Sequence, residues 1–230
     1  KRQNSILSNF MKSYNSTSDL PSKLAVFPLT GAVLFPQTQL PLNIFEPRYI
    51  QMIDEVLSSP DRIMGMIQPN ISKDNPNSKN LKKVGCAGRI SSFSETGDGR
   101  YLVTLTGLIR FEIAQELDTT TPYRQFITNY ENFAQDLKPA NTENIDRKSL
   151  LVLIKKYLEQ RNLLIDWEII EQSPTEQLIN YSGVLVPFEA EEKQLLLETK
   201  TLFDRCKTLE SLFQSYQFQN NQNTSSTELH

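Results

Sequence analysis

Residues 24–49 read LAVFPLTGAVLFPQTQLPLNIFEPRY, a series of short apolar runs separated by four prolines and a glycine. The prolines exclude a long helix across this stretch and favour short strands with kinks, because proline lacks a backbone donor. Leu42 and Ile44 lie in one such strand, and Pro47 then opens a helix, since proline at the first helical position costs no hydrogen bond. We expect the helix to end at the Ser-Ser-Pro run of 58–60. Its apolar face holds Tyr49, Ile53, Val56 and Leu57.

The segment from residue 62 to residue 133 is rich in short predicted strands. One strand covers 62–68, and a polar loop follows it. Residues 84–96 and 100–106 form a hairpin around Gly97-Asp98-Gly99, and Gly107 is expected to break the second strand. In the next strand, 108–116, apolar residues alternate with Arg110 and Glu112; a last strand covers 123–133. Short strands at this spacing favour a barrel or sandwich over a sheet of βαβ units.

After Pro139 the apolar period changes from two residues to 3.6, the period of a helix. Residues 150–158 form one amphipathic helix. Residues 173–176 combine a capping box with an early proline, which predicts a helix start, and Pro187 ends that helix. A final helix has an apolar stripe formed by Leu202, Cys206, Leu209, Phe213 and Tyr216.

These patterns divide the chain into four segments. We expect a flexible lead over 1–22, a β domain over 23–135, a helical domain over 143–217 and a disordered tail over 218–230. The fold class is therefore α+β, with a β-rich domain that contains one short helix and a following α-helical domain.

Composition excludes several classes of protein. The chain of 230 residues carries a net charge of −3, so no global positive field indicates nucleic acid. No apolar run is long enough for a transmembrane helix, and the polar N-terminal segment lacks the apolar centre of a signal peptide. We therefore expect a cytoplasmic protein with free thiols at Cys86 and Cys206. The one histidine is residue 230, which excludes histidine-based triads and multi-histidine zinc sites. We expect no metal and no cofactor.

Several ordered blocks of the sequence resemble one known family. Residues 27–29, 33–36 and 40–49, the last of which reads LPLNIFEPRY, are similar to the opening of the Lon protease N-terminal, substrate-binding domain. Further similar blocks are 84–90, 98–101, 107–111 and 187–198, together with Arg205. The resemblance covers about 24–216. It implies a PUA-like β pseudobarrel followed by an α-helical bundle.

A complete Lon protease also has an ATPase module and a Ser–Lys peptidase domain. The chain contains no G-x-x-x-x-G-K-[ST] phosphate loop, and no length remains after the helices for a peptidase. It thus resembles the stand-alone bacterial Lon-domain proteins, for which a peptidase label would be inherited by homology. Asn43 departs from the family pattern, in which histidine is frequent at this position.

The resemblance implies a non-enzymatic module that binds exposed apolar segments of unfolded or extended polypeptides. Such a module could serve as an adaptor or regulator in protein quality control. The region 27–45 holds more apolar residues than one small strand region can bury, so part of it is expected to line an exposed groove. The candidate polypeptide-binding residues are Phe27, Phe35, Leu40, Leu42, Phe45, Arg48 and Tyr49.

Alternative interpretations stay open. Glu46 could cap the helix while Arg48 pairs with a carboxylate and Tyr49 packs inward, so that this cluster is structural. The PUA-like fold would also suit RNA, with contacts from Lys73, Lys79, Lys82 and Lys83, although no aromatic residue lies among them for base stacking. A third alternative, an ATP-independent peptidase, needs a Ser–Lys or carboxylate centre that the sequence does not reveal. Cys86 is expected to be a buried structural thiol.

Overall fold

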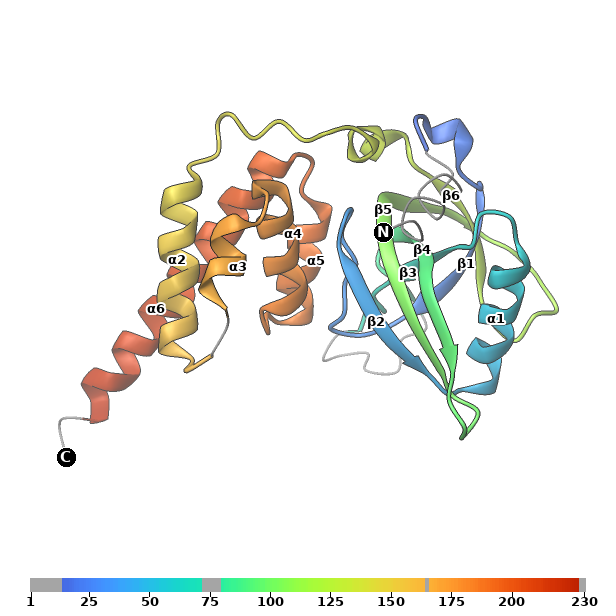
Figure 1. The fold of residues 1–230 in the computed structure, drawn as a ribbon, viewed down its shortest axis with the longest axis horizontal. Coiled ribbons are helices and arrows are strands. Elements are labelled where there is room, and N and C mark those ends of the chain that lie inside the picture. The colour runs from blue at the N-terminus through green and yellow to red at the C-terminus, as the bar shows by residue number, and fades with distance from the viewer. Residues whose placement is uncertain (1–13, 72–79, 164–165, 228–230) are drawn as a thin grey trace, which may run out of the picture.

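The computed structural model describes residues 14–71, 80–163 and 166–227, with side chains through residue 218. A β part and a helical part lie side by side, and a linker connects them across one end of the molecule (Figure 1). This arrangement confirms the α+β class. No helix among the described residues has the length and apolar character needed to cross a membrane.

The β part is a closed sheet of six strands in the order β2-β5-β4-β3-β1-β6, in which β5 also pairs with β6. The strands are β1 (Lys23–Pro28), β2 (Gln39–Ile44), β3 (Ile63–Ile67), β4 (Val84–Glu95), β5 (Tyr101–Glu116) and β6 (Gln125–Asn129). β1 and β3 run parallel, and the other pairs are antiparallel. Because β5 pairs with three other strands, the sheet forms a pseudobarrel around one apolar core.

Strand β5 is continuous through Gly107, so the expected break at this residue is wrong. A Cβ at position 107 would lie only 2.0 Å from the Phe35 carbonyl oxygen. Glycine is therefore required because another backbone segment approaches closely. The Gly107 amide donates to the Thr38 carbonyl (2.9 Å), and the Gln37 amide donates to the Gly107 carbonyl (2.9 Å). These bonds fasten the loop before β2 to the middle of β5.

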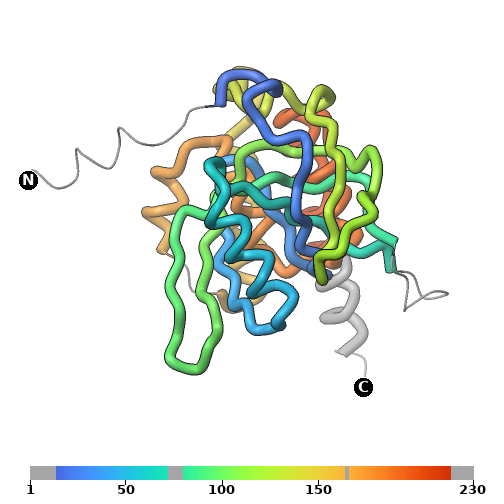
Figure 2. Tube along the Cα trace, turned by 90° about the vertical axis from the view of Figure 1, so that its right-hand side faces the viewer, coloured from blue at the N-terminus to red at the C-terminus, as the bar shows by residue number. Residues whose placement is uncertain are grey.

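Helix α1 (Pro47–Ser58) begins and ends where the sequence predicts. Its buried residues are Tyr49, Met52, Ile53 and Val56. The last strand is shorter than the predicted range 123–133. Strand β6 ends at Asn129, and the 3-10 helix η3 (Glu131–Leu137) follows it. The hairpin of β4 and β5 projects beyond the rest of the barrel (Figure 2).

The helical part consists of α2 (Arg147–Gln160), α3 (Trp167–Gln172), α4 (Thr175–Leu185), α5 (Ala190–Glu198) and α6 (Leu202–Thr227). The predicted capping box at 173–176 is wrong. Pro174 is the N-cap residue of α4 and makes no side-chain cap, while the Ser173 hydroxyl donates to the Ile169 carbonyl at the end of α3. Helix α6 continues to Thr227, past the expected start of a disordered tail, because neither proline nor glycine interrupts it. Residues 228–230 of that tail lie outside the described residues.

The N-terminal lead is partly packed onto the barrel. Tyr14 and Leu20 are buried on either side of a short 3-10 helix, η2 (Thr17–Asp19). The Tyr130 hydroxyl also donates to the Pro21 carbonyl (2.7 Å). Part of the expected flexible lead thus contacts the barrel, and residues 1–13 lie outside the described part.

Phe35 joins the β part to the helical part. Its ring is fully buried, with the Arg205 guanidinium 4.9 Å from the ring centre. A Cβ on Gly183 of α4 would lie 2.6 Å from the same ring, so helix and ring are in close contact. Nearby, the Asn180 amide donates to the Pro36 carbonyl (3.0 Å). The chain segment before β2 is thus held between barrel and helices.

A second connection runs through Gln194 of α5. Its side-chain amide donates to the Val84 carbonyl (3.1 Å), and its oxygen accepts from the Gln68 amide (3.1 Å). Gln68 also donates to the Ala190 carbonyl (2.8 Å). The Gln194 amide, the Gln194 side-chain oxygen and the Gln68 amide all have hydrogen-bond partners within the interface. Their burial therefore does not cost the free energy of an unpaired polar group.

Candidate functional site

An exposed apolar surface lies where β2 ends beside the β4–β5 hairpin. Phe45 follows β2 and is 63% exposed, and Leu102 on β5 is 46% exposed. Leu102 pairs with Asn43 of β2, two residues before Phe45. The Arg100 guanidinium lies 5.6 Å from the centre of the Phe45 ring. We call Phe45 and Leu102, together with Arg100, the outer apolar surface.

The same end of the hairpin exposes a second aromatic side chain. Phe93 of β4 is partly exposed and packs edge-on against Tyr101, with ring centres 4.9 Å apart. The Tyr101 hydroxyl donates to the Asp54 carboxylate on α1 (3.0 Å), which anchors the turn end of the hairpin to that helix. Aromatic rings with one apolar face free are suited to pack against side chains of another chain.

A groove of about 730 Å³ lies beside the start of α1. Its lining includes Arg48, Tyr49, Glu116, Tyr123 and Arg124. The Arg48 guanidinium binds the Glu46 carboxylate (2.7 Å) and lies 4.5 Å from the centre of the Tyr49 ring. Burial raises the pKa of Tyr49, so its hydroxyl stays protonated at neutral pH and can donate a hydrogen bond.

The predicted binding residues fall into three groups by burial: buried, partly buried and exposed. Three of them are buried in the core, which corrects the expectation that they line an exposed groove: Phe27, Phe35 and Leu42. Tyr49 is also mostly buried, although it contributes to the lining of the groove beside α1. Phe27 packs edge-on against Tyr49 (4.5 Å) under α1, and Phe35 lies under the helices. Leu40 is partly buried against the core. Phe45 and Arg48 are exposed at the junction of β2 and α1.

The structural interpretation of the Glu46 cluster is confirmed for two of its residues. Arg48 pairs with a carboxylate, and Tyr49 packs inward. Glu46 occupies the N-cap position of α1 but makes no side-chain cap, because its carboxylate is bound by Arg48. The predicted cap is therefore wrong.

Sequence reasoning missed Leu102 and Phe93. Tyr101-Leu102-Val103 is a run of three apolar residues in a strand, and alternation forces the middle one to face away from the other two. Val103 is buried in the core. The run therefore contained the signal that Leu102 faces outward.

Two of the four lysines proposed for RNA are paired with carboxylates. Lys82 pairs with Glu191 (2.6 Å), and Lys83 pairs with Glu112 (3.4 Å). Lys73 and Lys79 lie outside the described residues. Carboxylates beside two of the lysines reduce the positive potential that phosphate binding needs.

Two potentially reactive side chains, those of Cys86 and Lys193, are engaged in the fold. Cys86 is buried, and burial raises the pKa of its thiol, which disfavours the reactive thiolate. The Lys193 ammonium donates to the carbonyls of Gly31 (3.1 Å) and Val184 (3.3 Å). Among the residues that the structure describes, no group of three or more His, Cys, Asp or Glu side chains could hold a metal ion.

Comparison with known proteins identifies one family throughout. The ATP-dependent protease La (LON) substrate-binding domain matches residues 23–215. Lon protease of Buchnera aphidicola is 26% identical over 84% of this chain and 25% of its own length. Lon protease 2 of Myxococcus xanthus is 28% identical over 82% of this chain and 23% of its own length. The chain thus spans about a quarter of the length of these curated relatives.

Two solved structures share the fold. The N-terminal domain of the Mycobacterium avium complex Lon protease superposes with a TM-score of 0.61 at 16% identity, covering 84% of this chain and 98% of that one. A Lon N-terminal domain protein from Xanthomonas campestris superposes with a TM-score of 0.58 at 17% identity, covering 83% of this chain and 98% of that one. Since the family match extends over nearly the whole described structure, the chain belongs to the Lon substrate-binding domain family.

Proposed function

We propose that this chain binds exposed apolar segments of unfolded or extended polypeptides through the outer apolar surface, without catalysing a reaction on them. The exposed pair of Phe45 and Leu102 carries the proposal, because most other apolar residues of 24–49 are at least partly buried. Membership of a substrate-binding domain family supports it. Two buried, unpaired thiols suit a reducing compartment such as the cytoplasm. The module then acts as an adaptor or regulator in protein quality control.

The chemistry of the surface sets the kind of client. Phe45 and Leu102 offer apolar area, and Arg100 beside them offers hydrogen-bond donors for client carbonyl groups. Binding driven by burial of apolar area is screened little by salt. Affinity is modest, because an extended client loses chain entropy when it docks.

The test is a titration of a fluorescent, permanently unfolded polypeptide at 50 and 200 mM salt. Phe45→Ser and Leu102→Ser should each weaken binding by roughly tenfold or more, since burying such a side chain contributes about 1.5–3 kcal/mol. The matched control is Val152→Ser, because Val152 is equally exposed at 65% but lies on α2 in the helical part.

Equal losses in the Val152→Ser control and the two surface variants would contradict the proposal. A single-stranded RNA is titrated in parallel. Binding of RNA alone, with affinity falling steeply between the two salt concentrations, would instead favour the nucleic-acid alternative.

A further inference from the structure

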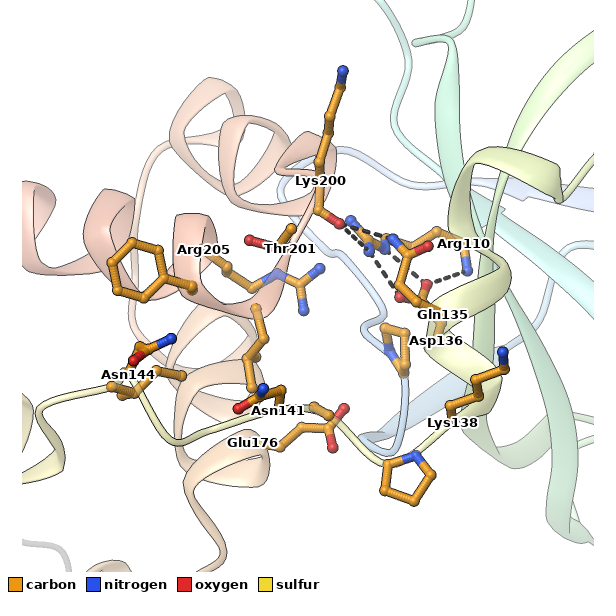
Figure 3. Close-up of a pocket in the computed structure, with 16 residues that line it drawn as sticks. Arg110, Gln135, Asp136, Lys138, Asn141, Asn144, Glu176, Lys200, Thr201 and Arg205 are labelled. Atoms are coloured by element: carbon orange, nitrogen blue, oxygen red, sulfur yellow. Dashed lines mark hydrogen bonds and ion pairs between the residues drawn. The ribbon is translucent and has the colours of Figure 1, made fainter.

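A separate cavity of about 520 Å³ lies between the β part and the helical part. The linker residues 138–145 cover one side, and η3 and the beginnings of α4 and α6 form the others (Figure 3). Its apolar lining is supplied by Pro36, Pro139, Ala140, Ile145, Leu202 and Phe203. This volume and mixed lining are typical of sites for small organic ligands.

Arg205 is the unusual member of the lining. Only 3% of the residue is exposed, and its guanidinium points into the space that the lining residues surround (Figure 3). Nε donates to the Leu196 carbonyl (3.1 Å) and Nη1 to the Asn180 side-chain oxygen (2.6 Å). Nη2 is buried and has no hydrogen-bond partner in the described structure. A buried cation with an unused donor is costly unless an anion compensates it.

The nearby carboxylates of Asp136 and Glu176 offset the charge of Arg205 only in part, because Arg110 lies near it as well. Arg110 is already neutralised by Asp136, with 2.7 Å between Nη2 and Oδ1. Lys138 and Lys200 line the cavity but are exposed to solvent, and Glu176 lines it as well. Burial raises the pKa of Glu176, but where it is ionised it repels a further anion. A singly charged ligand therefore suits the cavity better than a doubly charged phosphate.

We propose that this cavity binds an organic carboxylate with a short apolar body, and that Arg205 anchors the carboxylate while the apolar lining receives the body. The carboxylate can come from the free C-terminus of a polypeptide or from a small organic acid. Because Nη2 has almost no accessible surface, binding requires a local shift of the side chains packed around it. The outer apolar surface takes no part, so this proposal and the proposed function fail independently.

The probes are N-acetylleucine, an acetylated alanyl-alanyl-leucine tripeptide and the C-terminal amide of that tripeptide, titrated by calorimetry. Both acids should bind, and the amide should bind at least tenfold more weakly, because it has lost the charge that Arg205 would compensate. Tighter binding of the tripeptide identifies a polypeptide end as the source, and equal binding identifies a small acid. An amide that binds as tightly as the acid overturns the proposal.

Three variants test the residues. Arg205→Met should reduce the affinity for the acids at least tenfold, Lys200→Ala should reduce it about twofold, and Glu176→Gln should raise it about threefold. Lys156→Ala, at an exposed lysine of α2 away from the cavity, is the matched control and should change nothing. Glu176→Gln keeps the size of the side chain and removes any repulsion from an ionised carboxylate. Unchanged affinity for the acids in a folded Arg205→Met variant overturns the proposal, and where that variant fails to fold the amide probe decides.

Discussion

Arg110 concentrates more polar contacts than its neighbours on β5. Its Nε donates to Asp136 (2.8 Å), its Nη1 donates to the carbonyls of Leu197 (3.0 Å) and Thr199, and its charge lies 4.3 Å from the centre of the Phe133 ring. The guanidinium side chain is 1% exposed and the Asp136 side chain 8%. One side chain thus connects β5, η3 and the end of α5.

Arg110→Met should lower the free energy of unfolding by about 3–5 kcal/mol, because it leaves Asp136 buried without its partner. The measurement is urea denaturation followed by circular dichroism. The double variant Arg110→Met with Asp136→Leu should recover much of this loss, since it removes both charges together. A double variant as unstable as the single one would show that the backbone carbonyl contacts, and not the ion pair, dominate.

The two thiols should be unreactive in the folded protein. Burial, followed by the Glu210 carboxylate, raises the pKa of Cys206 to about 12, so at pH 8 only about one thiol in ten thousand is ionised. Burial raises the pKa of Cys86 as well. Titration with a chromogenic disulfide at pH 8 should detect no thiols before denaturation and two after it. Rapid reaction of one thiol in the native state would contradict the burial of that residue.

At the scale of elements, Gly107 allows β5 to act as one long strand. The Phe35 carbonyl occupies the space where a Cβ would lie, and Leu34 lies 3.2 Å from the same point. Because the neighbouring atom is backbone, no side-chain rotation relieves the clash. Strand β5 and the loop before β2 must separate to admit any larger residue.

Gly107→Ala should therefore destabilise the protein by about 2 kcal/mol or more, as overpacking of a well-packed core does. The control is Gly97→Ala in the hairpin turn, where an added Cβ meets nothing within 4 Å. That variant should change stability by less than about 0.5 kcal/mol. Similar melting temperatures for the two variants would contradict the close approach at Gly107.

At the scale of the whole molecule, the β part and the helical part share one apolar core. Residues of both parts belong to a single cluster of buried side chains. Phe35 and the Gln68–Gln194–Val84 hydrogen bonds connect the two parts away from the linker. We therefore expect the two parts to unfold together in one calorimetric transition.

Phe35→Ala should lower the free energy of unfolding by about 3–5 kcal/mol, because a fully buried ring leaves a cavity between the parts. It should also broaden or split the calorimetric transition, since the contact it removes couples barrel and helices. The exposed-site control, Val152→Ala on α2, should leave a single transition at nearly the original temperature. Two separate transitions in the unmodified protein would contradict the coupling.

Much of the local structure could be predicted from sequence because its causes are local. Pro47 begins α1, the Gly97-Asp98-Gly99 turn forms the hairpin, and the change of apolar period after Pro139 marks the helical part. Each of these signals acts between residues close in the chain. The resemblance of ordered blocks, above all at 40–49, then indicated the family.

The exposure of the candidate site was decided by the tertiary structure, because it depends on segments far apart in sequence. Alternation on β5 places Arg110 on the polar side, yet η3 and the end of α5 cover it. Phe35 is apolar like Phe45, but Gly183 and Arg205 close over its ring, whereas helices of the second part leave Phe45 exposed. The apolar pattern of the sequence by itself determined that these side chains favour burial. Only the packing of helices distant in sequence decided which of them are buried.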